Sequence, residues 1–146
     1  MFDVVNLTSA DFSSFLSSIS TFPAGFKLEG FAEGDAMSFN AVNIADMVKG
    51  VDGGAGYWYL PNTKEVTINL MPSTESTKRL LLIAGYMEAK KQPDLMQLVV
   101  TVPSMEMVFT FTDGVLVSYP PAAPIQSRLG NVQFAMKFSH CTAVPI

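Results

Sequence analysis

The most constraining feature of this sequence is a set of short segments in which apolar and polar residues alternate. The clearest covers residues 132–139, VQFAMKFS, where every second residue is apolar. A second covers residues 65–71 and places Val66, Ile68 and Leu70 on one face. A period of two is typical of a β-strand with one buried face. The chain is therefore predicted to be mainly β.

Weaker patterns of the same kind predict the other strands. They lie over residues 26–31, 35–42, 95–102, 106–112 and 115–119, and an aromatic strand starts at Tyr57. Glycine turns predict two β-hairpins, one over 26–42 around Glu33-Gly34-Asp35 and one at Asp113-Gly114. Residues 7–19 have apolar side chains at helix-like spacing, which allows a short helix there.

One principal helix is predicted over residues 74–90. Ser73 or Thr74 can cap its first turn, and Pro93 stops it. Its apolar face has the i, i+3, i+4, i+7 spacing of a helix packed on one side. Together these elements predict an antiparallel β-sandwich or barrel of about seven or eight strands with one flanking α-helix. Residues 1–146 are expected to form a single domain, with an N-terminal arm over residues 1–24.

Residues 43–56 have no sustained period and contain Gly50, Gly53, Gly54 and Gly56. They are predicted to form a long, adaptable loop outside the core. Loops of that length are usually functional.

Composition excludes several functions. Nine basic and 13 acidic residues give a net charge of −4, which disfavours tight nucleic-acid binding. A single cysteine, Cys141, and a single histidine, His140, cannot supply the usual zinc ligand sets. No catalytic constellation, metal site or cofactor site is indicated, so the chain is not expected to be an enzyme.

Membrane insertion and secretion are not expected either. The longest uncharged apolar run, Leu80 to Met87, is far shorter than the roughly 20 residues of a bilayer-spanning helix. The N-terminus has no basic segment followed by an apolar one, so no secretory signal is expected. The sequence nevertheless carries only 15% charged residues and has a mean hydropathy of +0.30. An ordinary soluble domain carries about 25%, so part of this surface is expected to be hidden against partners.

Residues 28–35, LEGFAEGD, begin a region that resembles the tail tube proteins of tailed bacteriophages, particularly those with contractile tails. In that family a turn of this type is followed by a second strand, a loop with a small residue, Asp and Gly, a Thr-Ile-X-Leu strand and a Pro/Ser/Thr-rich helix start. Here these features are Val51-Asp52-Gly53, Thr67-Ile68-Asn69-Leu70 and residues 72–76. The resemblance covers residues 25–82.

The resemblance implies a virion structural protein that forms hexameric rings, stacked into a hollow conduit for DNA ejection inside a contractile sheath. The implied partners are other copies of the chain, the sheath, tail terminator and baseplate proteins, and double-stranded DNA in passing through the lumen. The implied place is the virion tail, assembled in the host cytoplasm. Ring closure would also explain the missing charges, because it hides open sheet edges between subunits.

Three sets of site residues follow as expectations. Contacts between subunits or rings are assigned to the glycine-rich loop, the lumen lining to uncharged residues on outward strand faces, and the sheath contact to the polar helix face. The sets are Asp46, Lys49, Asp52 and Gly53 for the loop; Ser38, Asn40, Thr67 and Asn69 for the lumen; and Lys78, Arg79, Glu88, Lys90 and Lys91 for the sheath.

Two other functions stay open at this point. Apolar, methionine-rich strands also suit a small-molecule-binding β-barrel. The tube fold could equally serve a tail terminator, a baseplate hub, or the tube of a secretion or bacteriocin-like particle, since fold alone does not fix function.

Overall fold

The computed structural model describes residues 12–31, 36–122 and 130–146. Over these residues the chain forms nine strands and one α-helix, which confirms the mainly β fold. The elements are β1 (Ser13–Ser18), β2 (Phe26–Lys27), β3 (Met37–Phe39), β4 (Ala45–Lys49), β5 (Ala55–Tyr59), β6 (Lys64–Leu70), α1 (Glu75–Lys90), β7 (Met96–Val102), β8 (Met107–Ser118) and β9 (Val132–Pro145).

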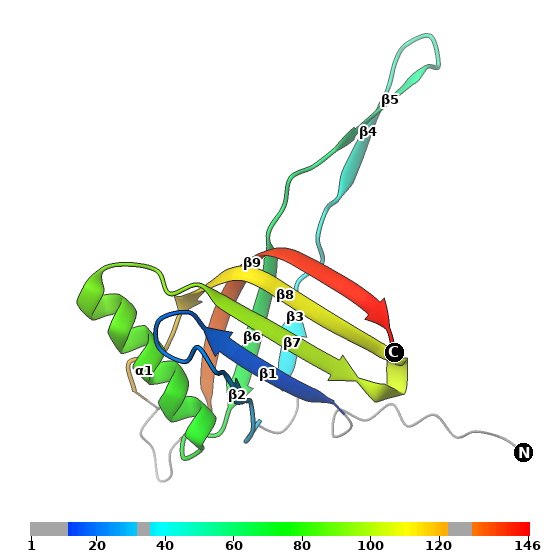
Figure 1. The fold of residues 1–146 in the computed structure, drawn as a ribbon. Helices are drawn as coiled ribbons and strands as arrows, with labels where there is room; N and C mark the ends of the chain where they lie inside the picture. The colour runs from blue at the N-terminus through cyan, green and yellow to red at the C-terminus, as the bar shows by residue number, and fades with distance from the viewer. Residues whose placement is uncertain (1–11, 32–35, 123–129) are drawn as a thin grey trace, which may run out of the picture.

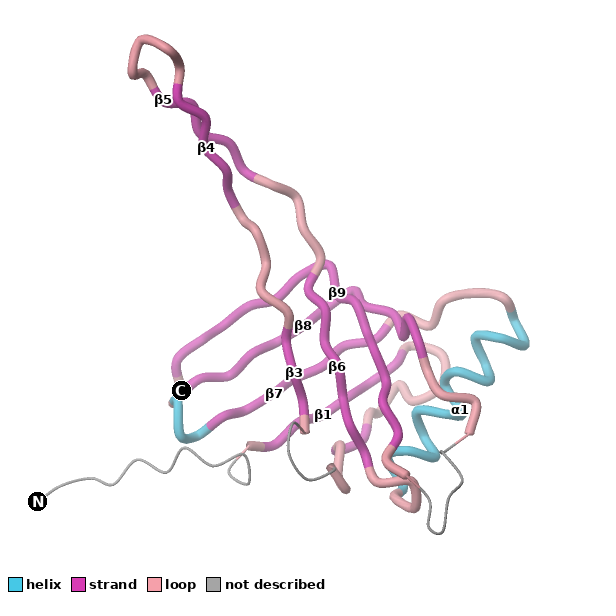
Figure 2. The backbone as a smooth tube through the Cα atoms, turned by 180° about the vertical axis from the view of Figure 1, so that it is seen from behind, coloured by secondary structure: helices cyan, strands magenta, loops and turns pink. Residues whose placement is uncertain are grey.

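Seven of the strands form one antiparallel sheet in the order β2-β1-β7-β8-β9-β6-β3. The sheet curls into a half-barrel, and α1 packs at one end of it (Figures 1 and 2). The two remaining strands, β4 and β5, pair only with each other and project away from the curled sheet (Figure 1). The fold thus has a packed body and one long projection.

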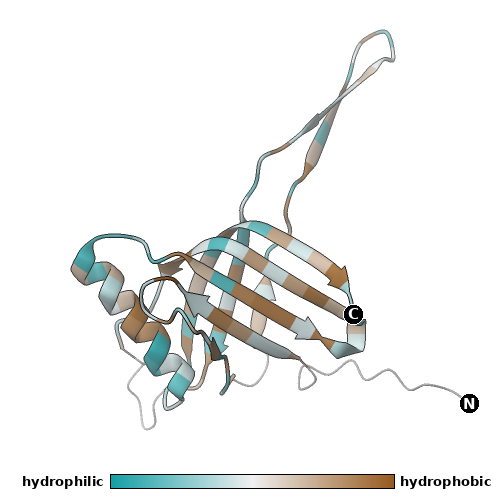
Figure 3. Ribbon diagram, viewed as in Figure 1, coloured by the Kyte–Doolittle hydropathy of each residue, from teal (hydrophilic) through white to brown (hydrophobic). Residues whose placement is uncertain are grey.

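The core lies on the inner face of the curled sheet, where alternate residues of the strands meet the apolar face of α1. Apolar and polar bands alternate along β8 and β9 in Figure 3, as a half-buried strand requires. The predicted alternation in β6 and β9 is confirmed. The fully buried side chains include Leu16, Val66, Ile68, Leu70, Leu80, Ile83, Leu98, Phe134, Met136 and Phe138.

Helix α1 begins and ends as predicted. Thr74 has extended backbone angles, and its hydroxyl oxygen accepts a hydrogen bond from the Thr77 N–H at 3.4 Å. The Ser76 hydroxyl in the first turn accepts a hydrogen bond from the Glu29 N–H at 2.8 Å, which ties the chain after β2 to the helix. Leu80, Ile83 and Ala84 then fill the interface with the sheet.

We expect Thr74→Ala to lower the free energy of unfolding by about 1 kcal/mol, since it removes the N-cap acceptor. Urea denaturation followed by circular dichroism measures the change. Ser73→Ala is the matched control, because Ser73 is exposed and precedes the cap. An equal loss in the two variants would contradict the capping role of Thr74.

The expected hairpin over residues 26–42 is wrong. β2 pairs with β1 and β3 pairs with β6, so these two strands lie at opposite edges of the sheet, although Phe31 at the end of the first segment forms a bridge with Leu70 of β6. Alternation identifies a strand but does not identify its partner. The turn residues Glu33-Gly34-Asp35 lie outside the described residues.

The expected turn at Asp113-Gly114 is also wrong, because β8 runs straight through it. The pairing of β8 with β7 shifts register at this point, which is a bulge. Asp113 takes the left-handed conformation, and a Cβ on Gly114 would lie 2.1 Å from the Phe138 ring. The chain reverses instead at Pro103–Met105, where Glu106 has a positive φ of 55°.

The short helix allowed over residues 7–19 is replaced by β1 in its described part, and residues 7–11 lie outside the described residues. The helix-like spacing of the apolar residues gave a wrong prediction, because Phe15 and Ile19 are exposed and do not form a buried helix face. Ser14 and Ser18 take the buried positions on either side of Leu16. The Ser18 hydroxyl is satisfied there by the Phe22 N–H at 2.9 Å.

Candidate assembly surfaces

The projection is a β-hairpin rather than the predicted loop. β4 and β5 pair from Ala45↔Tyr59 to Lys49↔Ala55, and Gly50 donates its N–H to the Gly54 carbonyl at 2.7 Å to close the turn. The loop interpretation failed because neither face is buried, so apolar residues occur on both faces and no alternation results. The prediction that this segment lies outside the core is confirmed, since every residue of both strands is exposed.

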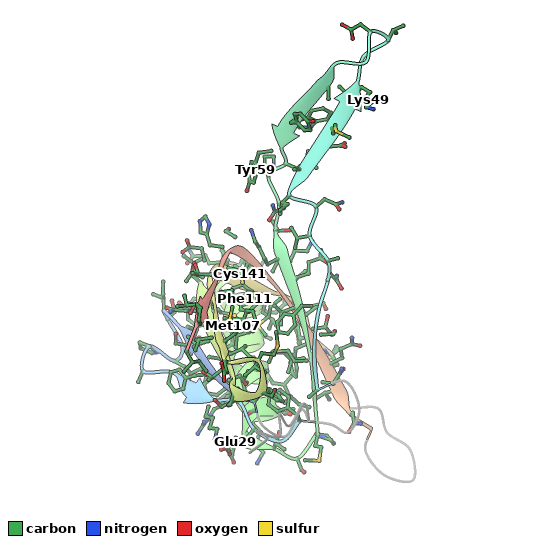
Figure 4. The ribbon with its side chains drawn as sticks, turned by 90° about the vertical axis from the view of Figure 1, so that its right-hand side faces the viewer. Glu29, Lys49, Tyr59, Met107, Phe111 and Cys141 are labelled. Atoms are coloured by element: carbon green, nitrogen blue, oxygen red, sulfur yellow. The ribbon has the colours of Figure 1, made fainter. Side chains whose placement is uncertain are left out.

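The four loop residues predicted to make contacts all lie on this hairpin. The Asp52 carboxylate accepts a hydrogen bond from the Gly54 N–H at 3.0 Å, and Gly53 takes a positive φ of 89°. These two residues therefore shape the turn. The Asp46 carboxylate accepts from the Met47 N–H at 2.7 Å. Lys49 is exposed at the outer end, far from the sheet (Figure 4).

Sequence reasoning missed the apolar character of the hairpin surface. Seven large apolar side chains are exposed along it, and Tyr57 is 75% exposed. Exposed apolar side chains gathered on one projection are typical of an interaction site. In the sequence, this surface corresponds to two clusters of apolar residues, one before and one after the glycines of the turn. The residues are Ile44, Met47, Val48, Val51, Tyr57, Trp58 and Tyr59.

The four predicted lumen residues share the outer face of the sheet. Ser38 pairs with Thr67 between β3 and β6, and Asn69 pairs with Gln133 of β9. The Asn40 side-chain amide donates a hydrogen bond to the Glu65 carboxylate. Glu65 also forms an ion pair with Lys137 at 3.4 Å. Charge is therefore neutralised locally on this part of the face.

The predicted sheath residues are not equivalent. Arg79 is partly buried with its guanidinium 5.2 Å from the centre of the Phe26 ring, so it packs within the chain. Glu88 accepts a hydrogen bond from the Tyr119 hydroxyl at 3.4 Å, and Lys78 pairs with Glu75 at 3.6 Å. Lys90 and Lys91 are exposed at the C-terminal end of α1.

An apolar hollow lies at the end of the half-barrel where the hairpin leaves the sheet. Its volume is about 290 Å³. Phe39 is 48% exposed there and stacks on Phe111 with ring centroids 5.5 Å apart and planes 4° from parallel. Figure 4 shows Phe111 and Cys141 near the base of the hairpin. The lining residues are Phe39, Asn40, Val42, Lys64, Glu65, Phe109, Phe111 and Cys141.

Burial raises the pKa of the Cys141 thiol, and the charge of Lys64 acts weakly in the opposite direction. A raised pKa leaves less thiolate at a given pH, so we expect Cys141 to react more slowly with iodoacetamide in the folded chain than in urea. The folded rate should keep rising at pH values where the unfolded rate has levelled off. Mass spectrometry of the alkylated protein measures both rates, and equal profiles would contradict the burial of this thiol.

Among the described residues, no helix is long and apolar enough to cross a membrane. Within the same residues, no group of three or more His, Cys, Asp and Glu side chains is placed to hold a metal ion.

The geometry defines a curled antiparallel sheet with one helix and a projecting hairpin. Several solved structures have a similar fold. One is the terminating cap of the anti-feeding prophage tube, with a TM-score of 0.61 and 8% identity over 100% of this chain and 95% of that one. Another is a sheath/tube terminator of an extracellular contractile injection system, with a TM-score of 0.62 and 7% identity over 95% and 96%.

A third similar structure belongs to the baseplate of the anti-feeding prophage, with a TM-score of 0.60 and 10% identity over 98% of both chains. At these identities the likeness shows the fold alone. Curated proteins give no sequence match. A family model described as "Tail fiber protein gp32" matches residues 5–142, and the chain belongs to that family. The sequence resemblance was to tail tube proteins, and the match confirms a phage-tail-like protein without naming a tube.

Proposed function

We propose that this chain is a structural protein of a phage-like tail that assembles with other copies of itself into hexameric rings, stacked as a hollow tube. The observation that carries the proposal is the β4–β5 hairpin, because seven large apolar side chains project into solvent on an arm that lacks a core of its own. Contact with a neighbouring subunit or ring would bury them. Asp46 and Lys49 would add polar contacts at that interface.

The two edges of the seven-stranded sheet are available for ring formation, although strands this short limit lateral pairing. β2 has two residues and β3 has three, and they form the two edges of the seven-stranded sheet. Open edges invite pairing with another chain, and head-to-tail contacts close into a ring when the rotation allows. Lateral joining of the sheets would thus use backbone groups that are open in a single copy.

The outer sheet face supports a role as a conduit. Ser38, Thr67 and Asn69 are uncharged, and the charges beside them, Glu65 and Lys137, neutralise each other. A lumen with few free cations would let DNA slide, because each Lys or Arg contact to phosphate releases counterions and adds affinity. The proposed role is structural and needs no catalysis or cofactor.

The proposed partners are the sheath protein, the tail terminator and the baseplate, within a virion tail assembled in the host cytoplasm. The fold is shared by a terminating cap and a baseplate component, which favours a terminator or baseplate subunit as the second candidate. The two candidates differ in polymerisation, since a tube protein adds ring upon ring and a terminator stops.

Negative-stain electron microscopy of the purified protein tests the proposal. Hollow tubes of variable length are the expected result. Uniform single rings would favour the terminator, and thin rods would favour a fibre subunit. A monomer at high concentration by size-exclusion chromatography would overturn self-assembly and favour the small-molecule-binding β-barrel.

Lys90→Glu combined with Lys91→Glu should weaken co-assembly with the sheath protein several-fold while tube formation is unchanged, since these exposed charges lie on α1, away from the hairpin. Co-sedimentation of sheath with preformed tubes measures the effect. Lys90→Arg combined with Lys91→Arg, which keeps both positive charges, is the matched control and should bind the sheath normally. Normal sheath binding by the double variant would mean that this end of α1 is a solvated surface and not a sheath contact.

A further inference from the structure

The second half of β9 has a neighbouring strand on one side only. β8 pairs with it from Ala135 to Pro145, whereas β6 pairs only from Val132 to Phe138. Among the described residues no strand pairs with the other side of residues 139–145, which form the upper border of the sheet in Figure 1. The Lys64 ammonium donates to the Ser139 carbonyl at 3.5 Å, so the open stretch begins just beyond it.

This open edge lacks the usual protection against pairing. Natural edge strands are blunted by charged side chains, bulges or prolines. Residues 139–145 read SHCTAVP, with no Lys, Arg, Asp or Glu and with proline only at the last position. All of them are exposed except Cys141, which is half-buried. An edge of this length and composition is suited to strand addition.

The apolar hollow lies beside this edge. Cys141 belongs to both, and Phe109 and Phe111 lie on β8 behind it. Side chains of an added strand alternate between the two sheet faces. Every second side chain of that strand would therefore enter the hollow beside Phe39 and Phe111, while its backbone paired with β9.

The β4–β5 hairpin has the length and, within the described part of the chain, the unpaired backbone that addition to this open edge requires. A two-stranded hairpin alone is marginally stable in water and gains stability when a third strand is added. β4 and β5 are each five residues long, which fits the seven-residue edge. The hairpin of the same chain points away from its own β9 edge (Figures 1, 2 and 4), so the added strand must come from a second copy.

We propose that the β4–β5 hairpin of one copy adds to the open edge of β9 in the next copy, with its Met47, Tyr57 and Tyr59 face in the hollow. The register places these three side chains on one face of the hairpin and Asp46, Val48 and Trp58 on the other. The first face carries Lys49 at its outer end, and the long side chain of a lysine can keep its ammonium in water, whereas insertion of the second face would desolvate the short Asp46 carboxylate. The inference rests on the proposed function, since it requires copies of the chain to be neighbours.

The single cysteine makes the contact testable. Met47→Cys and Tyr57→Cys, made one at a time, place a thiol on the face assigned to the hollow, one on each strand of the hairpin. A disulfide needs Cα atoms about 4.4–6.8 Å apart, and neighbouring strands lie about 4.8 Å apart, so only the variant on the strand beside β9 can reach Cys141. Oxidation with diamide at about pH 8.5, where more of the Cys141 thiol is ionised, should give intermolecular disulfides between Cys141 and the introduced cysteine. Each chain then carries one donor and one acceptor site, so a ladder beyond dimer is expected on a non-reducing gel.

Three controls make the ladder specific. Val48→Cys and Trp58→Cys place the thiol on the opposite hairpin face and should give no ladder. The double variant Tyr57→Cys, Cys141→Ala has one cysteine per chain. Oxidation can therefore link no more than two copies, and no species beyond dimer should appear. Peptide mapping by mass spectrometry identifies the linked pair. A ladder from the opposite-face variants, or none from any variant, overturns the proposal.

Hydrogen exchange provides a second readout without substitutions. Those amides of residues 140–144 that point toward the open edge should exchange quickly in dilute protein and slowly in the assembled form. Protection that is already complete at high dilution would mean that the edge is occupied within one chain, which overturns the proposal.

Tubes seen by electron microscopy without the ladder would overturn this contact alone, whereas absence of both tubes and ladder would overturn the proposed function as well.

Discussion

Removal of the hairpin should abolish self-assembly and leave the body folded. The stems already meet in hairpin geometry, because the Leu60 N–H donates to the Ile44 carbonyl at 3.0 Å. Residues 45–59 can therefore be replaced by Asn-Gly, which favours the tight turn of a two-residue hairpin loop. The excised residues contribute nothing to the buried core, so we expect the melting temperature to change by only a few degrees.

Size-exclusion chromatography with light scattering and negative-stain microscopy measure the outcome. The parent chain should form rings or tubes, and the excised variant should be a monomer at the same concentration. Asp52→Asn is a control that keeps the hairpin and the side-chain oxygen that accepts from the Gly54 N–H. Tubes of normal length from the excised variant would contradict the role given to the hairpin.

Phe134→Ala should lower the free energy of unfolding by about 3–5 kcal/mol, a large share of the stability of an ordinary domain. Phe134 is fully buried near the start of β9, where Ile68 of β6 pairs with it, and its truncation leaves a cavity that the sheet cannot close. Denaturant unfolding followed by fluorescence measures the loss.

Gln133→Ala is the matched control for this substitution. Gln133 is the neighbouring residue on the same strand, with its side chain exposed on the outer face. We expect its free energy of unfolding to change by less than about 0.5 kcal/mol. Similar losses of unfolding free energy in both variants would mean that β9 is sensitive to any truncation. The inner face would then contribute no more to stability than the outer face.

Local signals in the sequence were sufficient for the elements but not for their arrangement. The alternation of Val66, Ile68 and Leu70 and the cap at Thr74 depend on neighbours within a few residues, and both predictions are confirmed. Partner choice depends on contacts between distant segments, which alternation does not encode. For that reason the 26–42 hairpin was wrong although both of its segments contain strand residues.

The candidate site was predicted in position but not in form. The glycine-rich segment is indeed outside the core, yet it is a paired hairpin, because backbone hydrogen bonds can hold two strands together without a buried face. The hollow at Phe39 and Phe111 had no sequence signal, since it is created by β3 and β8, which lie far apart in the chain. The roles assigned to the lumen, sheath and contact residues stay predictions.

The pairing of β1 with β7 has a consequence for how the chain folds. Ser13 pairs with Thr101, so this pairing cannot form until β7, about 80 residues further along the chain, has been synthesised. Sheets that depend on such distant partners fold slowly, on the order of milliseconds to seconds. β9, whose open edge would receive a neighbour, follows every other described strand and α1 in chain order. A nascent chain therefore cannot offer this edge until the other described strands have been synthesised, which delays association until the body can fold.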